Sequence, residues 1–337
     1  MRRLLLLCSV GLLWPALVQP TAAYAETDVI KIPRGAGGVG FLPLLVLEQK
    51  GLIEKKASEA GIANLKVEWL KLGGPALVND LLLSGNADIV AAGPPAFLTL
   101  WDRTRGNLKV KGVAAMTSVP MYLNTRSPHL KTLKDFGPTD KIAVTAVKVS
   151  IPAIILQMAA IKEFGRAEWA AFDKYTVSLT HPDALIALTT ASGEINSHFT
   201  SPPFHQRERK FPNIRTILTS NDVMGGPSTF TMLYTTSKFH DANPKVYGAF
   251  LEAFKEALAF INGDKRAAAE TFLAMEKQNM TLDEVLEVLG DPDIRFTTSP
   301  ESLMKYAEFM AGVGSLKARP EDWKDLFFPA VHGVPGG

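Results

Sequence analysis

Residues 71–97 read KLGGPALVNDLLLSGNADIVAAGPPAF, and the chain repeats this pattern at residues 182–204, which read PDALIALTTASGEINSHFTSPPF. Five residues return at one constant offset: Ala76, Leu77, Gly85, Pro94 and Pro95 become Ala184, Leu185, Gly193, Pro202 and Pro203. The alternative is chance matching between helices rich in Ala, Leu and Gly. The shared Gly and Pro-Pro pair argue against chance, so the sequence predicts two similar units.

Each copy predicts a helix, a strand and the start of another helix. In the first copy, apolar residues at helical spacing precede Gly85 as a C-terminal cap, and residues 88–92 form a short apolar run typical of a buried strand. Pro94 and Pro95 open the next helix, where a missing N–H is harmless. The second copy predicts the same order: a helix over 184–191, a cap at Gly193, a strand over 195–200, and Ser201 as the N-cap before Pro202.

Two matching strand-to-helix turns indicate an α/β protein with two similar lobes. Ligands of such sheets bind beyond the carboxyl ends of the strands, where helix N-termini present unpaired N–H groups. We therefore expect a ligand cleft between the two lobes.

Composition excludes several classes of function. Lys and Arg number 36 against 34 Asp and Glu, and Arg2 and Arg3 lie in a segment that we expect to be removed, so charge favours no nucleic-acid partner. The single cysteine, Cys8, lies in the same segment, which leaves no disulfide, thiol nucleophile or cysteine-based metal site. The six histidines do not pair at metal-ligand spacing, so no metal site is expected.

Residues 1–25 have the organisation of a signal peptide. Arg2-Arg3 is a short basic region, residues 4–18 are apolar, and Ala23-Tyr24-Ala25 supplies a small-x-small cleavage signal. A retained anchor is the alternative, but the apolar run is short for a bilayer span and contains Pro15. We expect cleavage after Ala25 and a soluble periplasmic product.

The first lobe begins with a predicted strand at residues 28–32, a Gly-rich turn at 33–40 and a helix at 41–50. Such a turn lets backbone amides approach an anion, although its spacing matches neither a P-loop nor GxGxxG. A plain turn without a ligand remains the alternative.

The pattern restarts near Met121, where a second lobe is expected to begin. A strand at 141–145 leads to a helix from Pro152, and the strand at 230–235 is expected to return the chain to the first lobe. Residues from 243 onward predict packing helices, with a capping box at Thr281–Glu284 and a further helix opened by Ser299-Pro300. The expected division is residues 26–120 and 232–337 for lobe 1, and 121–231 for lobe 2.

Three segments carry a family resemblance: FLPLLVLEQKGLIEKK, LVNDLLLSGNADIVAAGPPAF and TSKFHDANPKVYGAFLEAFKEAL. They resemble the nitrate/sulfonate/taurine branch of periplasmic substrate-binding proteins of ABC transporters, which is related to the thiamine-pyrimidine-synthase-like domain. The resemblance covers nearly the whole mature chain. It implies a two-lobed α/β periplasmic-binding-protein fold (type II) with two crossover strands, which closes on one small molecule and delivers it to a permease.

The resemblance also implies ligand contacts in the strand-to-helix turns. The positions are Gly37, Gly38, Phe41, Gly73, Gly74, Gly93, Pro94, Lys148, Ser150, His198, Thr200, Ser201, Met224 and Gly225. Other readings stay open for several of them. Lys148 fits a solvated loop, His198 a satisfied structural histidine, and Phe41 the core, while the hydroxyls of Ser150, Thr200 and Ser201 also suit N-caps.

The favoured function is a transport receptor that binds one small solute by hinge closure. We expect a permease as its partner, a monomeric state and no cofactor. A small anion such as a sulfonate or carboxylate suits helix N-termini and few strong cations, whereas a neutral or heteroaromatic ligand, including a thiamine-pyrimidine precursor, stays open. The alternative is enzymatic, because the related branch contains thiamine-pyrimidine-precursor synthases. Those carry a cysteine-rich motif that the mature chain lacks, and no GxSxG motif marks a serine hydrolase.

Overall fold

The computed structural model describes residues 26–35, 37–71, 76–276 and 279–337. The expected signal peptide and two of the predicted ligand contacts, Gly73 and Gly74, lie outside the described residues. Within those ranges, no helix combines the length and the apolar character that crossing a membrane requires.

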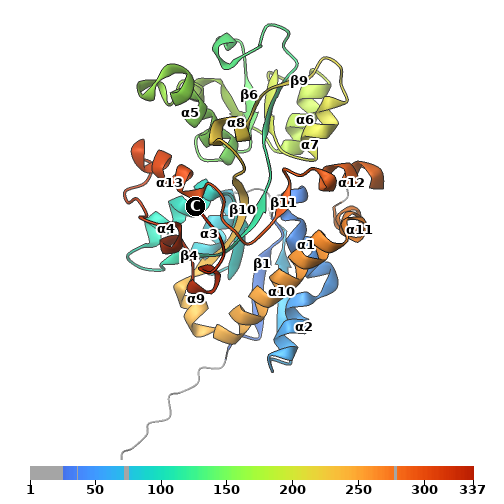
Figure 1. Ribbon diagram of the computed structural model, residues 1–337, viewed down its shortest axis with the longest axis vertical. Coiled ribbons are helices and arrows are strands. Elements are labelled where there is room, and N and C mark those ends of the chain that lie inside the picture. The colour runs from blue at the N-terminus through green and yellow to red at the C-terminus, as the bar shows by residue number, and fades with distance from the viewer. Residues whose placement is uncertain (1–25, 36, 72–75, 277–278) are drawn as a thin grey trace, which may run out of the picture.

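The first set of strands lies in the lower half of Figure 1 and consists of a two-stranded and a four-stranded sheet. Its members are β1 (Val29–Pro33), β2 (Lys66–Leu70), β3 (Ile89–Ala92), β4 (Val110–Ser118), β10 (Thr229–Thr236) and β11 (Arg295–Phe296). β1 pairs in parallel with β2, and β10 lies antiparallel between β3 and β4. β1 is joined to the start of β3 because Asp88 N donates to Lys31 O at 2.9 Å, and Lys31 N donates to Asp88 Oδ2 at 2.8 Å.

The second sheet lies in the upper half of Figure 1 and has five strands in the order β7-β6-β8-β5-β9. Its members are β5 (Tyr122–Thr125), β6 (Ile142–Val144), β7 (Thr176–Ser178), β8 (Ser197–Thr200) and β9 (Arg215–Thr219). β6 pairs in parallel with β7 and β8, whereas β5 is antiparallel to β8 and β9.

The strands of the two sets have the same spatial order. Each set includes one antiparallel strand, β10 or β5, that directly follows a strand of the other set along the chain. β2-β1-β3-β10-β4 corresponds to β7-β6-β8-β5-β9. The antiparallel member of the second sheet, β5, directly follows β4 of the first, and β10 brings the chain back after β9. The expected two crossings are therefore confirmed, and the strand order supports the sequence repeat.

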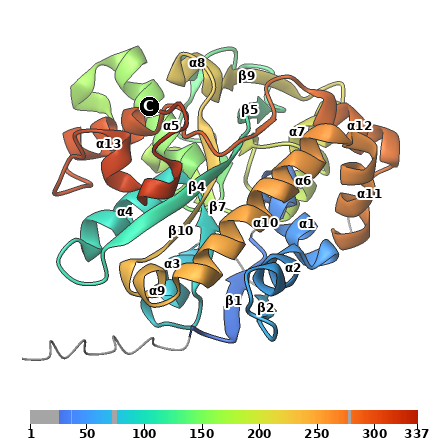
Figure 2. The ribbon, with the colours of Figure 1, turned by 60° about the horizontal axis from the view of Figure 1, so that its bottom comes forward.

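Helices cover the sheets and connect their strands (Figures 1 and 2). Those before the second crossing are α1 (Leu42–Lys50), α2 (Leu52–Glu59), α3 (Ala76–Leu83), α4 (Pro94–Thr104), α5 (Ile151–Phe164), α6 (His181–Thr189), α7 (Phe204–Arg209) and α8 (Ser220–Met224). Those after it are α9 (Ser237–Ala242), α10 (Pro244–Gly263), α11 (Lys265–Met275), α12 (Leu282–Gly290) and α13 (Leu303–Gly312). Single 3-10 turns occur at Val39–Phe41, Leu133–Asp135, Arg166–Glu168, Asp173–Tyr175, Trp323–Leu326 and Pro329–Val331.

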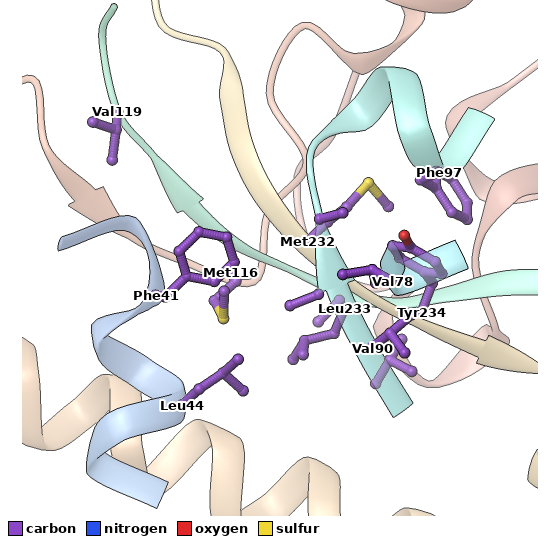
Figure 3. Close-up of a cluster of buried hydrophobic side chains, with 14 of the residues drawn as sticks. Phe41, Leu44, Val78, Val90, Phe97, Met116, Val119, Met232, Leu233 and Tyr234 are labelled. Atoms are coloured by element: carbon purple, nitrogen blue, oxygen red, sulfur yellow. The ribbon is translucent and has the colours of Figure 1, made fainter. Parts of the chain in front are cut away.

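The core of the first set is apolar and lies between its strands and α4. Figure 3 shows Val90 of β3, Phe97 of α4 and Tyr234 of β10 in one cluster, with the rings of Phe97 and Tyr234 5.4 Å apart. All three are fully buried. Burying a side chain of this size contributes about 1.5–3 kcal/mol, so these contacts fix the position of the β3–α4 turn.

The repeat is exact at its strands and differs at its turns. The offset that relates Pro94 to Pro202 also maps β3 onto β8 residue for residue. In the first copy, α4 begins at Pro94 as predicted. In the second, the prediction that Ser201 is the N-cap was wrong, because the Pro202–Pro203 peptide is cis and α7 begins only at Phe204, with Pro203 at its N-cap.

Two other helix boundaries also differ from prediction. α6 ends at Thr189, and Ala191 already has a left-handed backbone (φ 56), so Gly193 (φ 77) lies beyond the helix and is not its cap. α13 begins at Leu303 and not at Ser299-Pro300. By contrast, the capping box is confirmed, since Thr281 N donates to Glu284 Oε2 at 2.8 Å and Glu284 N donates to Thr281 Oγ1 at 3.3 Å.

Candidate functional site

A cavity of about 300 Å³ lies where the carboxyl ends of strands from both sets face each other. Gly37 follows β1, Gly93 follows β3, Thr145 follows β6 and Ser201 follows β8, and all four line the cavity. The location agrees with the general rule that open α/β sheets bind ligands beyond their strand ends.

The two sides of the cavity touch each other at its floor. A Cβ atom placed on Gly93 would lie 2.4 Å from Ile151 Cδ1, at the start of α5, and 3.3 Å from Phe230 O. Glycine at residue 93 thus lets the Ile151 side chain approach the backbone of the β3–α4 turn, and a side chain there would require Ile151 to shift.

Aromatic and aliphatic side chains make up much of the wall. Phe41 and Phe230 come from the first set, while Met121, Val149 and Ile151 belong to the segments that lead into and out of the second sheet. A solute that fits here has an organic body that these side chains contact.

Prolines remove many of the backbone donors that the sequence led us to expect. Pro94 and Pro95 occupy the first turn of α4, Pro152 that of α5 and Pro182 that of α6. Proline has no N–H, so these helix N-termini offer an anion fewer hydrogen bonds than an ordinary helix start. Polar recognition therefore falls mainly to side chains.

The structure brings together five of the predicted contact residues around this cavity: Gly37, Phe41, Gly93, Ser150 and Ser201. It places seven others away from the lining: Gly38, Pro94, Lys148, His198, Thr200, Met224 and Gly225. Gly38 lies next to this group, because a Cβ atom there would be 3.5 Å from Pro202 O across the cleft.

The residues away from the lining have identifiable local roles. Lys148 is exposed and has a left-handed backbone (φ 65), whereas His198 and Thr200 are fully buried residues of β8. Met224 and Gly225 end α8, where Met224 O accepts a hydrogen bond from Lys305 Nζ.

Sequence reasoning missed several lining residues, of which His181, Asp80 and Arg103 carry chemistry. The sequence repeat could have identified His181. The offset that relates Pro94 to Pro202 places His181 opposite Gly73, a position already predicted to contact ligand. Asp80 and Arg103 are single exposed charges on helices, and nothing in their spacing marks them.

His181 is the outer end of a buried row of polar side chains. Its Nδ1 lies 2.8 Å from His198 Nε2, and His198 Nδ1 lies 2.5 Å from Glu208 Oε1. Asn124 Nδ2 donates to Glu208 Oε2 at 2.7 Å. His198 and Glu208 are fully buried, whereas the His181 ring is partly exposed to the cavity.

Burial, and then the neighbouring His198, lower the pKa of His181 well below its ordinary value of 6.5. His181 is therefore neutral at physiological pH when the cavity holds no charged solute. Its ring packs at 5.3 Å from that of Phe204, which fixes its orientation.

Ser201 supplies a second polar group at the wall. Ser201 is buried, with 4% exposed, and it lines the cavity. Asn79 also lines the cavity, but its amide already accepts from Tyr234 OH at 2.7 Å and donates to Ala96 O at 3.0 Å. A solute therefore meets the hydroxyl of Ser201 and the imidazole of His181, but not a free Asn79.

Metal ligands do not gather at this site. Within the described ranges, no three His, Cys, Asp or Glu side chains cluster so as to hold a metal ion. The ionisable side chains that the structure brings together behind the cavity wall form one row, from His181 to Glu208.

Comparison by sequence found nothing, since no protein-family model and no curated protein matches this chain. Comparison by structure found the alkanesulfonate-binding protein SsuA from Xanthomonas axonopodis pv. citri, solved bound to MOPS. It is 15% identical with a TM-score of 0.68, and the match covers 88% of this chain and 96% of SsuA. The Candida albicans CA3427 gene product, described as having the generic periplasmic binding protein fold, matches at 14% identity with a TM-score of 0.65, over 90% and 96% of the two chains.

This chain has the periplasmic-binding-protein fold. The nitrate-binding protein NrtA from Synechocystis PCC 6803 has a similar structure, at 16% identity and a TM-score of 0.68, over 89% of this chain and 84% of NrtA. At these identities the likeness shows the fold alone. The periplasmic-binding-protein fold accounts for the shared strand order, the two crossings and the cavity between the two sheets.

Proposed function

We propose that this chain is an extracytoplasmic solute-binding protein of an ABC importer. It binds one small organic anion, of sulfonate or carboxylate type, by hinge closure and delivers it to a permease. The two closing bodies are residues 26–120 with 232–337, and residues 121–231. The chain acts in the periplasm as a monomer, and it is not an enzyme.

The observation that carries this proposal is the cavity between two sheets, which the chain connects by the crossings from β4 to β5 and from β9 to β10. Lining residues come from both sides, and Gly93 meets Ile151 across the floor. A solute in the cavity contacts both bodies at once, so its binding energy favours the closed arrangement over the open one.

The choice of an organic anion rests on the wall. Phe41 and Phe230 suit an apolar body, while Ser201, His181 and Arg103 are the groups that can face an anionic end. Three similar structures point the same way: the SsuA proteins of Xanthomonas and Escherichia coli are named for binding sulfonates, and NrtA for binding nitrate.

The aromatic wall also suits a heteroaromatic solute, so a pyrimidine-precursor binding protein is the second candidate within the same receptor class. A precursor synthase has no observation in its favour, because the only cysteine of the chain is Cys8, which lies in the expected signal peptide.

A thermal-shift screen tests the proposal. The purified protein is melted at fixed salt with nitrate, aliphatic and aromatic sulfonates, carboxylates and pyrimidines. A specific solute at ~100 times its Kd adds about 2.7 kcal/mol to the free energy of unfolding. We expect organic sulfonates or carboxylates to raise the melting temperature. A rise with pyrimidines alone favours the second candidate, and a flat response to every class contradicts the receptor function.

A further inference from the structure

The ionisable row behind the cavity is not required by packing. At the repeat offset, His198 corresponds to Val90 and Glu208 to Leu100, and both of these apolar side chains are buried in the first copy. The same strand and helix positions are thus filled once by hydrocarbon and once by a histidine and a carboxylate. The fold does not need the polar version, which points to a role in the adjoining cavity.

The distances fix where protons lie in the row. Glu208 accepts from Asn124 through Oε2, and its Oε1 is 2.5 Å from His198 Nδ1. The contact of 2.8 Å between His198 Nε2 and His181 Nδ1 requires one proton between the two nitrogens, because two facing lone pairs repel.

With its fewest protons, the row exposes an acceptor to the cavity. His198 donates from Nδ1 to Glu208, so its Nε2 is bare and must accept from His181 Nδ1–H. The Nε2 of neutral His181 is then bare as well. Within the described residues that nitrogen makes no hydrogen bond, and the ring lines the cavity.

One additional proton reverses this polarity. Whether it rests on His198 or on Glu208, His198 Nε2–H now donates to His181 Nδ1, and His181 carries its own proton on Nε2. The cavity wall then presents a donor. A sulfonate or ionised carboxylate has only acceptor oxygens, so it can hydrogen-bond to His181 only after the row has gained a proton.

We propose that Glu208, His198 and His181 form a proton relay that takes up one proton from solvent when an organic anion binds. This inference rests on the proposed receptor function and adds to it a specificity determinant. In the state with the additional proton, the cavity selects solutes with oxygen acceptors. In the state with the fewest protons, it selects solutes with N–H donors. Anion affinity then rises as pH falls.

Other titratable groups surround the row, and their charges affect the pH at which the row gains its additional proton. Burial lowers the pKa of His181, which disfavours a doubly protonated His181 ring in the free protein. The neighbouring titratable groups are His205 and Arg209 on α7, Asp183 on α6, Asp80 on α3, Arg103 on α4 and Glu276 after α11. Asp80 and Arg103 line the same cavity with opposite charge, so neither sign dominates from that side.

Calorimetric titration of the purified protein with benzenesulfonate counts the protons. Titrations at one neutral pH in Tris and in triethanolamine, which have different ionisation enthalpies and are not anionic, give the uptake from the difference in apparent binding enthalpy. We expect close to one proton per bound sulfonate, and a Kd that rises by up to about tenfold for each unit of increasing pH.

Two variants locate the proton. The double variant His198→Val/Glu208→Leu installs the residues of the first copy, so it is expected to fold, to bind benzenesulfonate more weakly and to take up no proton. His181→Phe keeps the ring beside Phe204 and removes both nitrogens, and it decides the question if the double variant does not fold. The matched control is His240→Phe, a histidine that stacks on Phe328 at 4.1 Å, does not line this cavity and is expected to leave the uptake unchanged.

The outcomes separate the relay from the receptor function. Benzenesulfonate binding with no proton uptake in the wild type, or with uptake unchanged in both relay variants, overturns the relay and leaves the receptor function standing. If neither benzenesulfonate nor any other sulfonate or carboxylate binds, the anionic receptor function fails and the relay fails with it.

Discussion

The two copies of the repeat share the same strand-to-helix arrangement but have apolar residues in one and polar residues in the other at equivalent buried positions. In the first, Val90 and Leu100 pack in hydrocarbon, and in the second the equivalent residues are His198 and Glu208, also fully buried. The turn after the strand changes in the same sense, from Gly93 to Ser201. At these positions the first copy supplies a close-packed wall, and the second supplies Ser201 and the polar row that ends at His181.

The comparison supports the proposal that the buried histidine and carboxylate serve the adjoining cavity and not the packing. Replacing a buried ion pair by well-packed apolar residues is often neutral or stabilising, whereas removing one partner alone is costly. The first copy shows that the apolar solution exists in this very fold. The predictions below exchange residues between the copies, from the largest expected effect to the smallest.

Glu208→Leu alone is expected to lower the free energy of unfolding by about 3 to 5 kcal/mol, because it leaves His198 and Asn124 without their buried partner. His198→Val/Glu208→Leu is expected to recover most of that loss. Urea unfolding measures both. The control is Glu252→Gln, which breaks an exposed pair with Lys255 and costs no more than about 1 kcal/mol. Equal losses in the single and double variants contradict the equivalence of the copies.

His205, which replaces Phe97 of the first copy, gives the second copy a pH dependence of stability. Burial, and then Arg209, lower the pKa of His205 from 6.5 to about 4. Between these values the unfolded chain binds the proton and the native protein does not, so stability falls as pH falls. The contribution is about 3 kcal/mol, lost between pH 6.5 and 4.

His205→Phe restores the residue of the first copy and keeps a ring on Tyr122, which His205 stacks at 3.6 Å. Its free energy of unfolding, measured by urea at several pH values, is expected to fall less steeply than that of the wild type over this window. Parallel curves for the two proteins argue against a neutral His205 in the native state.

Gly93→Ala places a methyl group where Ile151 Cδ1 lies at 2.4 Å, so the two walls can no longer approach as they do. We expect solute affinity to fall by at least about tenfold, or ~1.4 kcal/mol, with folding retained. Gly93→Ala/Ile151→Ala is expected to regain affinity, and Gly106→Ala, which meets open space, is the control. Calorimetry measures the three. Unchanged affinity in Gly93→Ala would show that this contact plays no part in closure.

Ser201→Ala removes the hydroxyl at the position that corresponds to Gly93. The expected loss is about fivefold in affinity, or ~1 kcal/mol, which is typical of one hydrogen bond, with little change in melting temperature. A large drop in melting temperature without solute would instead assign the hydroxyl a structural role.

The sequence predicted the architecture because hydrophobic period and turn residues are local signals. The strand that became β3 and the capping box at Thr281 both follow from neighbouring residues. The start of α7 could not be predicted in this way, since the same Pro-Pro pair opens α4 directly but precedes α7 as a cis peptide.

The site was only partly predictable, since it depends on which side chains long-range packing turns toward the cavity. Gly93 and Ser201 were accessible from the repeat, and whether they bind ligand stays a prediction. Lys148 looked suitable by charge but lies exposed away from the lining. Arg103 gave no signal, because a charge in the last turn of a helix is ordinary on any surface.

The most direct test of the receptor account is a calorimetric titration of the wild type and of Ser201→Phe with the best solute from the thermal-shift screen. The account predicts one site per wild-type chain, and loss of binding when the phenyl ring fills the cavity of a variant that remains folded. Binding of equal affinity in both proteins would place the solute elsewhere and contradict the assignment of this cavity.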